Sequence, residues 1–343
     1  MKKTGGKKTK GKRAKSRRIS LKLGFFLLLF LGVWGGVSEW FVHHPRAWLE
    51  ERRASWPTIL TASLYWMGNP LADFTDSLDW TGHDAVYEYD TEAPDNAILF
   101  AGAPRRTGDP APSDIRILNR GEFLIGWSDR LRHPVWCAYH VRRDANFDAG
   151  ERPGFLRDRA VAAAPRPDDY TKSGYDRGHM VPNYAIATRY GDLERKKTFM
   201  MSNIAPQTPA LNRGVWRNLE HRIADLWTAR YGEIWVIVGC ISHSRETLSG
   251  TNIDVPDEYY QLIVAQEGMD VRALAVLLRQ QVSWNEWAAR NIVTIDELEE
   301  RTGLDFNPEL PSFIQEPMEA DRPTRLWPIR LRDILKLVTL RYN

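Results

Sequence analysis

Cysteine is scarce in this chain, which has two among its 343 residues, Cys137 and Cys240. A single pair 103 positions apart cannot form a disulfide framework, so the fold has to rest on a packed core. Each cysteine lies in an apolar run typical of a core strand, which favours buried free thiols over a disulfide. His43, His44 and His243 lack paired ligands at zinc-site spacing. The sequence therefore indicates neither a disulfide scaffold nor a zinc site.

Most of the chain also lacks an excess of positive charge. Eleven Lys and Arg fall within residues 1–22, and the remaining 321 residues carry 36 basic against 44 acidic side chains. The body is therefore not a generally basic nucleic-acid binder. Residues 176–230 are net positive, with nine Lys and Arg against five Asp and Glu, so any attraction for phosphate has to be local.

Residues 23–38 contain no charged side chain, and they follow the basic segment 1–22 directly. Extended to 23–42, the apolar run has 20 residues, enough to span a lipid bilayer, although Glu39 lies near its far end. For this apolar run, an uncleaved membrane anchor is favoured over a cleaved export signal and over a buried helix. Residues 16–22 also resemble a twin-arginine export signal. We expect a single pass through a bacterial inner membrane, with the leader 1–22 in the cytoplasm and the rest on the periplasmic or extracellular side. A secreted protein is the alternative.

The rest of the chain is long enough for one large domain with appendages. Residues 43–96 alternate tryptophans, charges and helix formers, which predicts a helical linker. The less favoured interpretation is a surface that binds single-stranded nucleic acid by stacking. We place the main domain at 97–316 and a charged tail at 317–343.

Apolar runs of strand length within the main domain predict a sheet. Helical periodicity appears at 212–231 and 292–302, each followed by a glycine that stops the helix. The mixture predicts an α+β domain. The expected strands cover ILFAG at 98–102, FLIGW at 123–127, and the runs 135–141, 234–241, 259–265 and 272–278.

The most informative stretch is Tyr-Asp-Arg-Gly-His-Met-Val-Pro at 175–182. It places Asp176, Arg177 and His179 around one glycine, as a site would that holds a phosphodiester and deprotonates a water molecule. A lone histidine is more often structural, so the downstream residues decide the interpretation. Asn-Ile-Ala-Pro-Gln follows at 203–207, and Asn-Arg-Gly-Val-Trp-Arg-Asn-Leu-Glu at 212–220.

These three motifs, in this order, resemble the DNA/RNA non-specific endonuclease family. The likeness covers roughly 97–316 and includes the run 135–141, the segment 169–174 and the segment 295–311. It implies a ββα-metal (His-Me finger) nuclease fold, with a central, mainly antiparallel sheet flanked by helices.

The resemblance also implies roles for individual residues. His179 would be the general base, and Asn203 would support its loop through hydrogen bonds. Asn212 would hold Mg²⁺, which needs few protein ligands, although Mn²⁺ or another divalent cation is also compatible. Glu220 would accept hydrogen bonds from metal-bound water. The phosphate-binding arginines would be Arg177 and Arg130.

Asn212, Trp216 and Glu220 recur at intervals of four residues, so on a helix they would form one stripe. Without the resemblance, Asn212 would be interpreted as a helix cap, Glu220 as a solvated charge and Asn203 as a turn former. One departure from the family is Ala224, where an arginine is usual four residues after the helical glutamate.

The expected function is a membrane-anchored, Mg²⁺-dependent endonuclease with little sequence preference. It would cut DNA, with RNA as an open second substrate, and leave 5′-phosphate ends. The bilayer would be a second partner, and a homodimer is an open alternative for its assembly. Two other functions remain open: a phosphodiesterase that acts on a substrate other than nucleic acid, and an inactive tether that binds nucleic acid. Intact His179, Asn212 and Glu220 argue against the tether, which needs neither a base nor a metal ligand.

Overall fold

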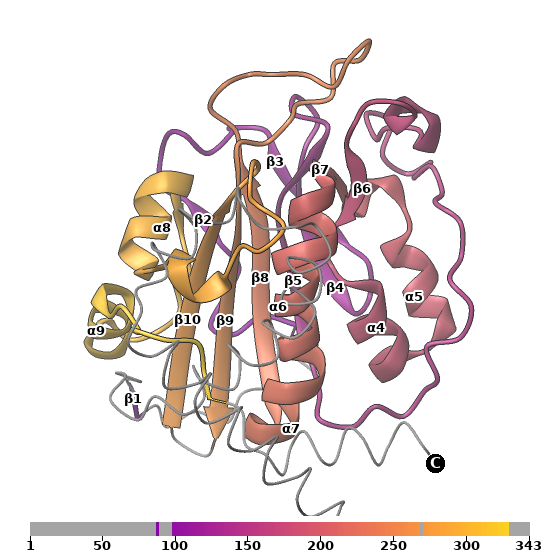
Figure 1. Cartoon of the computed structure of the whole chain (residues 1–343). Helices are drawn as coiled ribbons and strands as arrows, with labels where there is room; N and C mark the ends of the chain where they lie inside the picture. The colour runs from indigo at the N-terminus through magenta and orange to yellow at the C-terminus, as the bar shows by residue number, and fades with distance from the viewer. Residues whose placement is uncertain (1–86, 89–97, 268–269, 329–343) are drawn as a thin grey trace, which may run out of the picture. The chain divides into compact units, whose positions relative to one another are not determined.

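The computed structural model describes residues 87–88, 98–267 and 270–328. Its centre is an antiparallel sheet in the order β1-β10-β9-β8-β5-β4-β3, with β11 also paired to β10 (Figure 1). The expected α+β class with a mainly antiparallel central sheet is confirmed. The strands are β1 (Tyr87–Glu88), β3 (Ile115–Asn119), β4 (Phe123–Ser128), β5 (His133–Val141), β8 (Glu233–Ile241), β9 (Glu258–Glu267), β10 (Asp270–Arg279) and β11 (Ile292–Val293).

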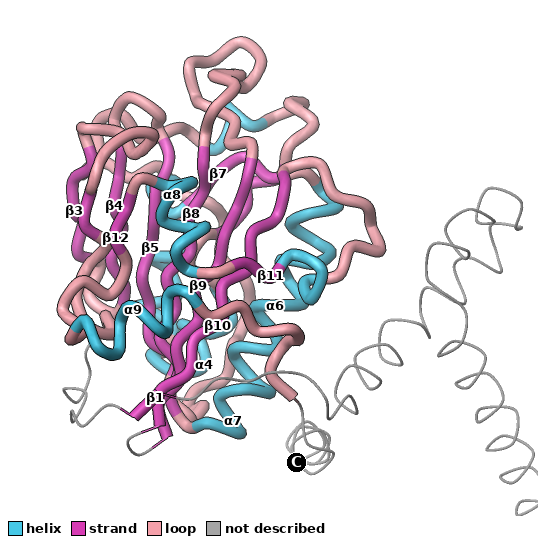
Figure 2. Tube along the Cα trace, turned by 90° about the vertical axis from the view of Figure 1, so that its left-hand side faces the viewer, coloured by secondary structure: helices cyan, strands magenta, loops and turns pink. Residues whose placement is uncertain are grey.

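Helices cover both faces of this sheet, so its central strands are apolar on both sides. Alternate side chains of β5 point to opposite faces: Tyr139 packs in the cluster that includes α4 (Asn183–Tyr190), and Ala138 packs in the cluster that includes α8 (Ile295–Thr302) and α9 (Ser312–Ala320). Figures 1 and 2 show α8 and α9 on one side of the sheet and α4 on the other. This double burial explains why the strands read as continuous hydrophobic runs.

The helix predicted at 212–231 is present, but its turns are not uniform. It begins as a wide π-type segment, η4 (Leu211–Trp216), and continues through α6 (Arg217–His221), a second π segment η5 (Arg222–Trp227) and α7 (Thr228–Tyr231). Gly214, at φ −100° and ψ −114°, breaks the helical geometry inside η4. The helix ends at Gly232, whose φ of 95° suits a residue without a side chain.

The strand predicted at 98–102 is wrong. Ala101 and Gly102 have positive φ values of 52° and 95°, and the segment forms bends instead of extended backbone. The carbonyl of Ala101 accepts a hydrogen bond from the backbone N–H of Glu309. Further along, β2 (Arg105–Arg106) pairs with β12 (Leu304–Asp305) in a small separate sheet.

The folded body extends past the boundary predicted at residue 316. Helix α9 crosses it, and Trp327 lies in the core, where its carbonyl accepts a hydrogen bond from the Trp227 indole at 3.0 Å. Within the predicted helical linker, Tyr87 and Glu88 form a strand on β10, which corrects the helical assignment for these two residues. The segments 1–22, 23–42 and most of 43–96 lie outside the described residues. Among the described residues, no helix is long and apolar enough to cross a membrane.

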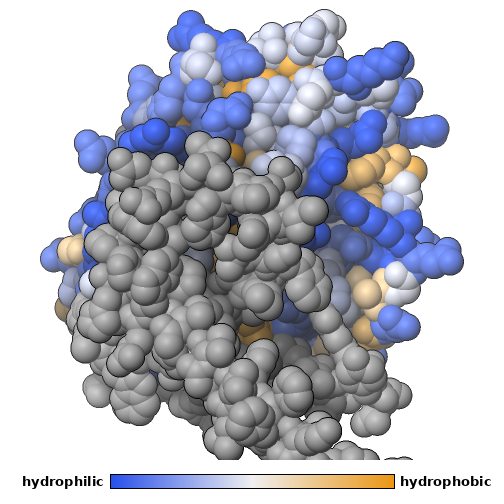
Figure 3. Space-filling view, viewed as in Figure 1, coloured by the Kyte–Doolittle hydropathy of each residue, from blue (hydrophilic) through white to orange (hydrophobic). Residues whose placement is uncertain are grey.

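Both cysteines are buried and unbonded to each other, as predicted. The Cys137 thiol lies 3.8 Å from Oδ1 of Asn203, and the Cys240 thiol donates to the carbonyl of Pro134 at 3.1 Å. Burial raises the pKa of Cys137 well above its ordinary value, so this thiol stays protonated and unreactive at neutral pH. On the face shown in Figure 3, the coloured residues are mostly hydrophilic, with small apolar patches among them.

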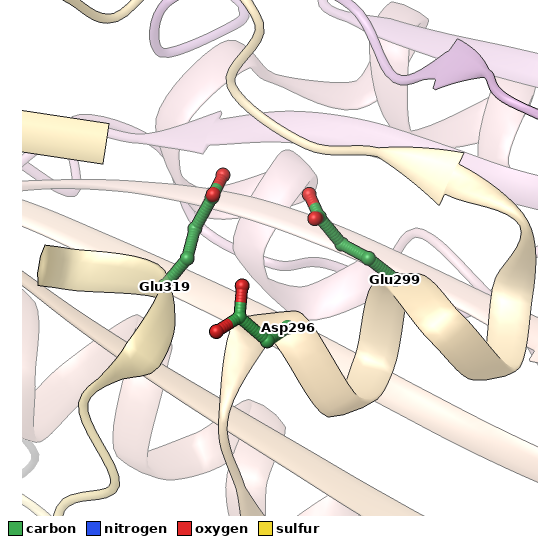
Figure 4. A group of neighbouring side chains, drawn as sticks. All are labelled: Asp296, Glu299 and Glu319. Atoms are coloured by element: carbon green, nitrogen blue, oxygen red, sulfur yellow. The ribbon is translucent and has the colours of Figure 1, made fainter. Parts of the chain in front are cut away.

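Three carboxylates gather where α8 meets α9: Asp296, Glu299 and Glu319 have ligand atoms within 4.8 Å of one another (Figure 4). Burial, with these acidic neighbours adding to it, raises the pKa of Glu299 to about 8 and that of Glu319 to about 7. Glu299 also accepts the backbone N–H of Phe306 at 2.7 Å. The cluster is therefore a place where ionisation works against folding.

Glu299→Gln is expected to raise the melting temperature at neutral and mildly alkaline pH. The folded state keeps the Glu299 proton up to about pH 8, whereas an unfolded glutamate releases it near its ordinary value of 4.5. The contribution of Glu299 to wild-type stability is therefore largest below pH 4.5 and falls as pH rises towards 8, while glutamine stays neutral and still accepts the Phe306 N–H. Between pH 5 and pH 8, the melting temperature of the variant should exceed that of the wild type by an increasing amount. Glu300→Gln, an exposed change on the same helix, is the control, and a difference that does not increase contradicts the prediction.

Candidate active site

The three sequence motifs form one compact ββα unit beside the main sheet. Strand β6 (Asp176–His179) pairs antiparallel with β7 (Ile204–Gln207), with His179 opposite Ile204, and η4 follows β7 after three residues. Helices α4 and α5 (Asp192–Thr198) lie between the two strands in sequence. The histidine and Asn212 are thus carried by neighbouring elements of one unit.

Asn203 fixes the loop that follows the histidine. Its side chain is fully buried, and its Oδ1 accepts the backbone N–H of Val181 at 3.0 Å. Its Nδ2 donates to the carbonyls of Val181 at 3.0 Å and Thr198 at 2.9 Å, and its own carbonyl accepts from Met180. These bonds connect the end of α5, the segment before β7 and the residues directly after His179.

His179 lies between two aromatic rings. Its ring centroid is 5.3 Å from that of Phe155 and 4.7 Å from that of Phe199. The ring is 7% exposed, and its Nε2 has no hydrogen-bond partner within the described structure. Burial, with a smaller effect from Arg152, lowers the pKa of His179 to about 3. The imidazole is therefore neutral at physiological pH, the form in which it can accept a proton.

Arg152 is a site residue that the sequence did not reveal. Its guanidinium carbon lies 5.3 Å from the Phe199 ring centroid and 5.9 Å from that of Phe155, the rings that flank the histidine. It lowers the pKa values of both His179 and Glu220, which places its charge close to both groups. No motif surrounds Arg152, so nothing in the sequence distinguishes it from other loop arginines.

The two arginines chosen from the sequence lie in different surroundings. Arg177 is half-buried; its Nε and Nη2 donate to the carbonyl of Pro167 at 2.9 and 2.6 Å, and its guanidinium carbon lies 5.4 Å from the Phe155 ring centroid. Arg130 is exposed in the turn between β4 and β5, and its backbone N–H donates to Asp114. The described structure gives Arg130 no contact with the other candidate residues.

Asp176 orients the amide of Asn212. The Asn212 Nδ2 donates to Asp176 Oδ2 at 2.9 Å, and Arg213 pairs with the same carboxylate at 2.7 and 2.6 Å. Because the nitrogen of the amide is occupied in this way, its Oδ1 remains as the group that can bind a cation. The side chain of Asn212 does not cap a helix, since η4 has Ala210 at its N-cap position and no side-chain cap bond.

Glu220 lies one helical turn beyond Trp216. Its Oε1 is buried without a hydrogen-bond partner in the described part of the chain. Burial raises the pKa of Glu220 to about 8, against the opposing influence of the Trp216 indole N–H and the charges of Arg152 and Arg217. A buried carboxyl with an unbonded oxygen, carried on the same helix as an oriented amide, fits a divalent cation that keeps most of its water ligands.

Gly178 has to be a glycine because Gln207 fills the space beside it. A Cβ at position 178 would lie 2.2 Å from Oε1 and 2.4 Å from Cδ of Gln207, whose side chain is fully buried. Gln207 lies inside the motif at 203–207, but no pattern in the sequence indicates this packing role.

Gly178→Ala is expected to destabilise the protein by about 1–3 kcal/mol, the usual cost of overpacking a filled interior, and to lower activity by moving the adjacent His179. Gly154→Ala is the matched control, since nothing lies within 4 Å of a Cβ there. Thermal melting and cleavage rates measure the two effects. Gln207→Ala in the Gly178→Ala background should recover part of the stability. Equal melting temperatures for the two glycine variants would show that the site tolerates a side chain.

One ββα unit carries a neutral buried imidazole, an oriented amide and a buried carboxyl, and the guanidinium of Arg152 lies close enough to lower the pKa of the imidazole and of the carboxyl. This combination defines a ββα-metal phosphodiester hydrolase. Comparison with known proteins agrees: the profile of the DNA/RNA non-specific endonucleases matches residues 102–313. The chain belongs to the DNA/RNA non-specific endonuclease family. It is therefore a nucleic-acid-hydrolysing enzyme, in a family that depends on divalent metal ions.

Individual relatives are distant in sequence, and all of those named below are nucleases. A nuclease of Nostoc sp. is 28% identical over 236 residues, which is 65% of this chain and 84% of that protein. Mitochondrial endonuclease G of Bos taurus is 26% identical over 243 residues, 61% of this chain and 79% of that protein. The mitochondrial nuclease EXOG of Mus musculus is 27% identical over 206 residues, and the match covers 55% of its length.

A crystal structure of EndoG in complex with EndoGI shares the fold. It superposes with a TM-score of 0.55 at 21% identity, covering 65% of this chain and 96% of that chain.

Proposed function

We propose that this protein is a membrane-anchored endonuclease that uses Mg²⁺ and cuts both DNA and RNA with little sequence preference, leaving 5′-phosphate ends. The observation that supports the chemistry best is the neutral, buried His179, carried on the same strand as Asp176, whose carboxylate orients Asn212. His179 takes the proton from the attacking water, and the charges of Arg152 and Arg177 attract the phosphodiester into the site.

Asn212 is the residue that would hold the metal ion, with Glu220 bonded to its water ligands. When bound, the ion would supply charge stabilisation at phosphorus and at the departing 3′ oxygen. Mn²⁺ or another divalent cation with oxygen preference suits the same amide and carboxyl groups.

Digestion of plasmid, single-stranded DNA and RNA by the full-length protein, with and without chelator, tests this function. We expect cleavage of all three substrates that stops when the chelator is added and returns with Mg²⁺. Chelator-resistant cleavage contradicts the metal requirement. Binding without cleavage supports a tether, and hydrolysis of a non-nucleic phosphodiester alone supports the other alternative. Sedimentation of the same preparation distinguishes a monomer from the homodimer that the sequence leaves open.

The catalytic domain is proposed to lie outside the cytoplasm, anchored by residues 23–42. The eleven basic residues of 1–22 flank the apolar run, and such flanks stay on the cytoplasmic side. Protease added to intact spheroplasts should degrade the domain. Protection until the inner membrane is broken contradicts this orientation, and a soluble form that lacks the first forty or so residues indicates a cleaved signal.

A further inference from the structure

The loop that follows β10 is bound to the segment that leads into the active-site helix. Gln280 is buried, and its Nε2 donates to the carbonyl of Pro206 at 2.8 Å. Its Oε1 accepts the backbone N–H of Thr208 at 2.9 Å, and its carbonyl accepts the Thr208 hydroxyl at 2.7 Å. The base of this loop is therefore fixed to the chain between β7 and Asn212.

The loop is also held at its other end. Glu286 donates its N–H to the carbonyl of Ser283 at 3.0 Å, its carboxylate accepts the Asn291 amide at 3.0 Å, and Ala288 is buried in the core. Val282, on the entering side, packs against the same core. Between these fixed flanks, Trp284 lies in the turn and is 51% exposed.

The backbone of Trp284 is close to the helix segment that carries the proposed metal ligand. Its carbonyl oxygen is 3.9 Å from the position that a Cβ of Gly214 would occupy, and Gly214 is two residues after Asn212. Two exposed cationic side chains, Arg213 and Arg217, lie on the same stretch of helix. Single exposed aromatic residues are common on protein surfaces; Trp284 differs from them by its fixed loop and by its position beside Gly214, two residues after Asn212.

We propose that Trp284 is a base-stacking residue that binds an unpaired nucleobase flanking the scissile phosphate. The inference rests on the proposed function and adds a preference to it, for single-stranded or locally unwound nucleic acid. Every base offers a π face, so stacking adds affinity without sequence selectivity. A base in a duplex has to leave its neighbours before it can stack on the indole, which costs free energy that a single strand does not need to supply.

The test compares kcat/KM on a single-stranded oligonucleotide and on the matching duplex, using the full-length protein. Trp284→Ala should lower the single-strand value by about 5- to 100-fold, the usual effect of losing one base–aromatic stack, and should lower the duplex value much less. Trp284→Phe should recover most of the difference because it restores an aromatic face. Phe313→Ala, which removes an aromatic side chain that is 78% exposed on α9, is the matched control and should change neither value.

A second measurement separates stacking from a structural effect. An oligonucleotide carrying 2-aminopurine beside the cleavage position, mixed with protein in the presence of Ca²⁺, should lose fluorescence with the wild-type protein and not with Trp284→Ala. If the ratio of single-strand to duplex kcat/KM is the same for the wild type and for Trp284→Ala, the stacking role is overturned while the nuclease function stands. A wild-type protein that cleaves no nucleic acid overturns both. If Trp284→Ala melts at a lower temperature, the fluorescence of Trp284→Phe decides, and a loss of quenching there contradicts stacking.

Discussion

His179→Ala is expected to lower the rate of phosphodiester cleavage by about 10²- to 10⁴-fold, the usual contribution of one general base. The reason is structural as well as chemical. His179 carries an unbonded Nε2 in a pocket formed by Phe155 and Phe199, and its pKa of about 3 keeps it neutral. Single-turnover cleavage with saturating Mg²⁺ measures the effect. His243→Ala, an exposed histidine elsewhere in the chain, is the control.

The pH dependence gives an independent check on this residue. An unfolded histidine takes up a proton below about pH 6.5, while folded His179 does so near pH 3, so the wild-type protein loses stability as pH falls through this interval. His179→Ala lacks that loss and should melt closer to the wild type at pH 5 than at pH 8. An unchanged cleavage rate in a folded variant would remove His179 from the mechanism.

Asn212→Ala is expected to raise the half-saturating Mg²⁺ concentration by more than about 100-fold. Loss of a residue that only hydrogen-bonds to a metal ligand usually costs about 10- to 100-fold in metal affinity, and Asn212 is proposed to be the ligand itself. The substitution removes the amide oxygen that Asp176 orients, but it leaves the charges of Arg152 and Arg177 in place. Nucleic-acid affinity in the absence of metal should therefore change little. Calorimetric titration with Mn²⁺ measures metal binding apart from activity.

Two further variants sharpen this result. Asn218→Ala removes an exposed asparagine from the same helix and should behave as the wild type. Asp176→Asn keeps the shape of the partner but removes the charge that orients Asn212 and pairs with Arg213, so metal affinity should fall by about 10- to 100-fold. If Asn212→Ala loses activity with unchanged metal affinity, the side chain has another role.

The long strands and the main helix could be predicted because their patterns are local. The runs at 234–241, 259–265 and 272–278 match β8, β9 and β10, since strands buried on both faces need uninterrupted apolar residues. The run at 98–102 has the same composition, but positive φ values at Ala101 and Gly102 bend it. Backbone geometry set by tertiary contacts overrode the propensity there.

The site was predictable where its residues lie in one motif and unpredictable where they meet through space. His179, Asn203 and Asn212 could be named because the family motifs contain them. Arg152 reaches the site from a loop without any motif, and the π-type turn of η4 makes the spacing between Asn212 and Glu220 irregular. A periodicity argument assumes regular turns, so it could place these residues on one helix but could not fix their contacts.

The contact between Trp227 and Trp327 also sets an order for biosynthesis. The helix that carries Asn212 and Glu220 continues into Trp227, whose indole bonds to a carbonyl 100 residues later in the chain. Chains are made from the N-terminus and domains fold as units, so Trp227 gains this partner only after residue 327 has emerged from the ribosome. A growing polypeptide that already contains all three motifs thus still lacks this tertiary contact at the end of the active-site helix.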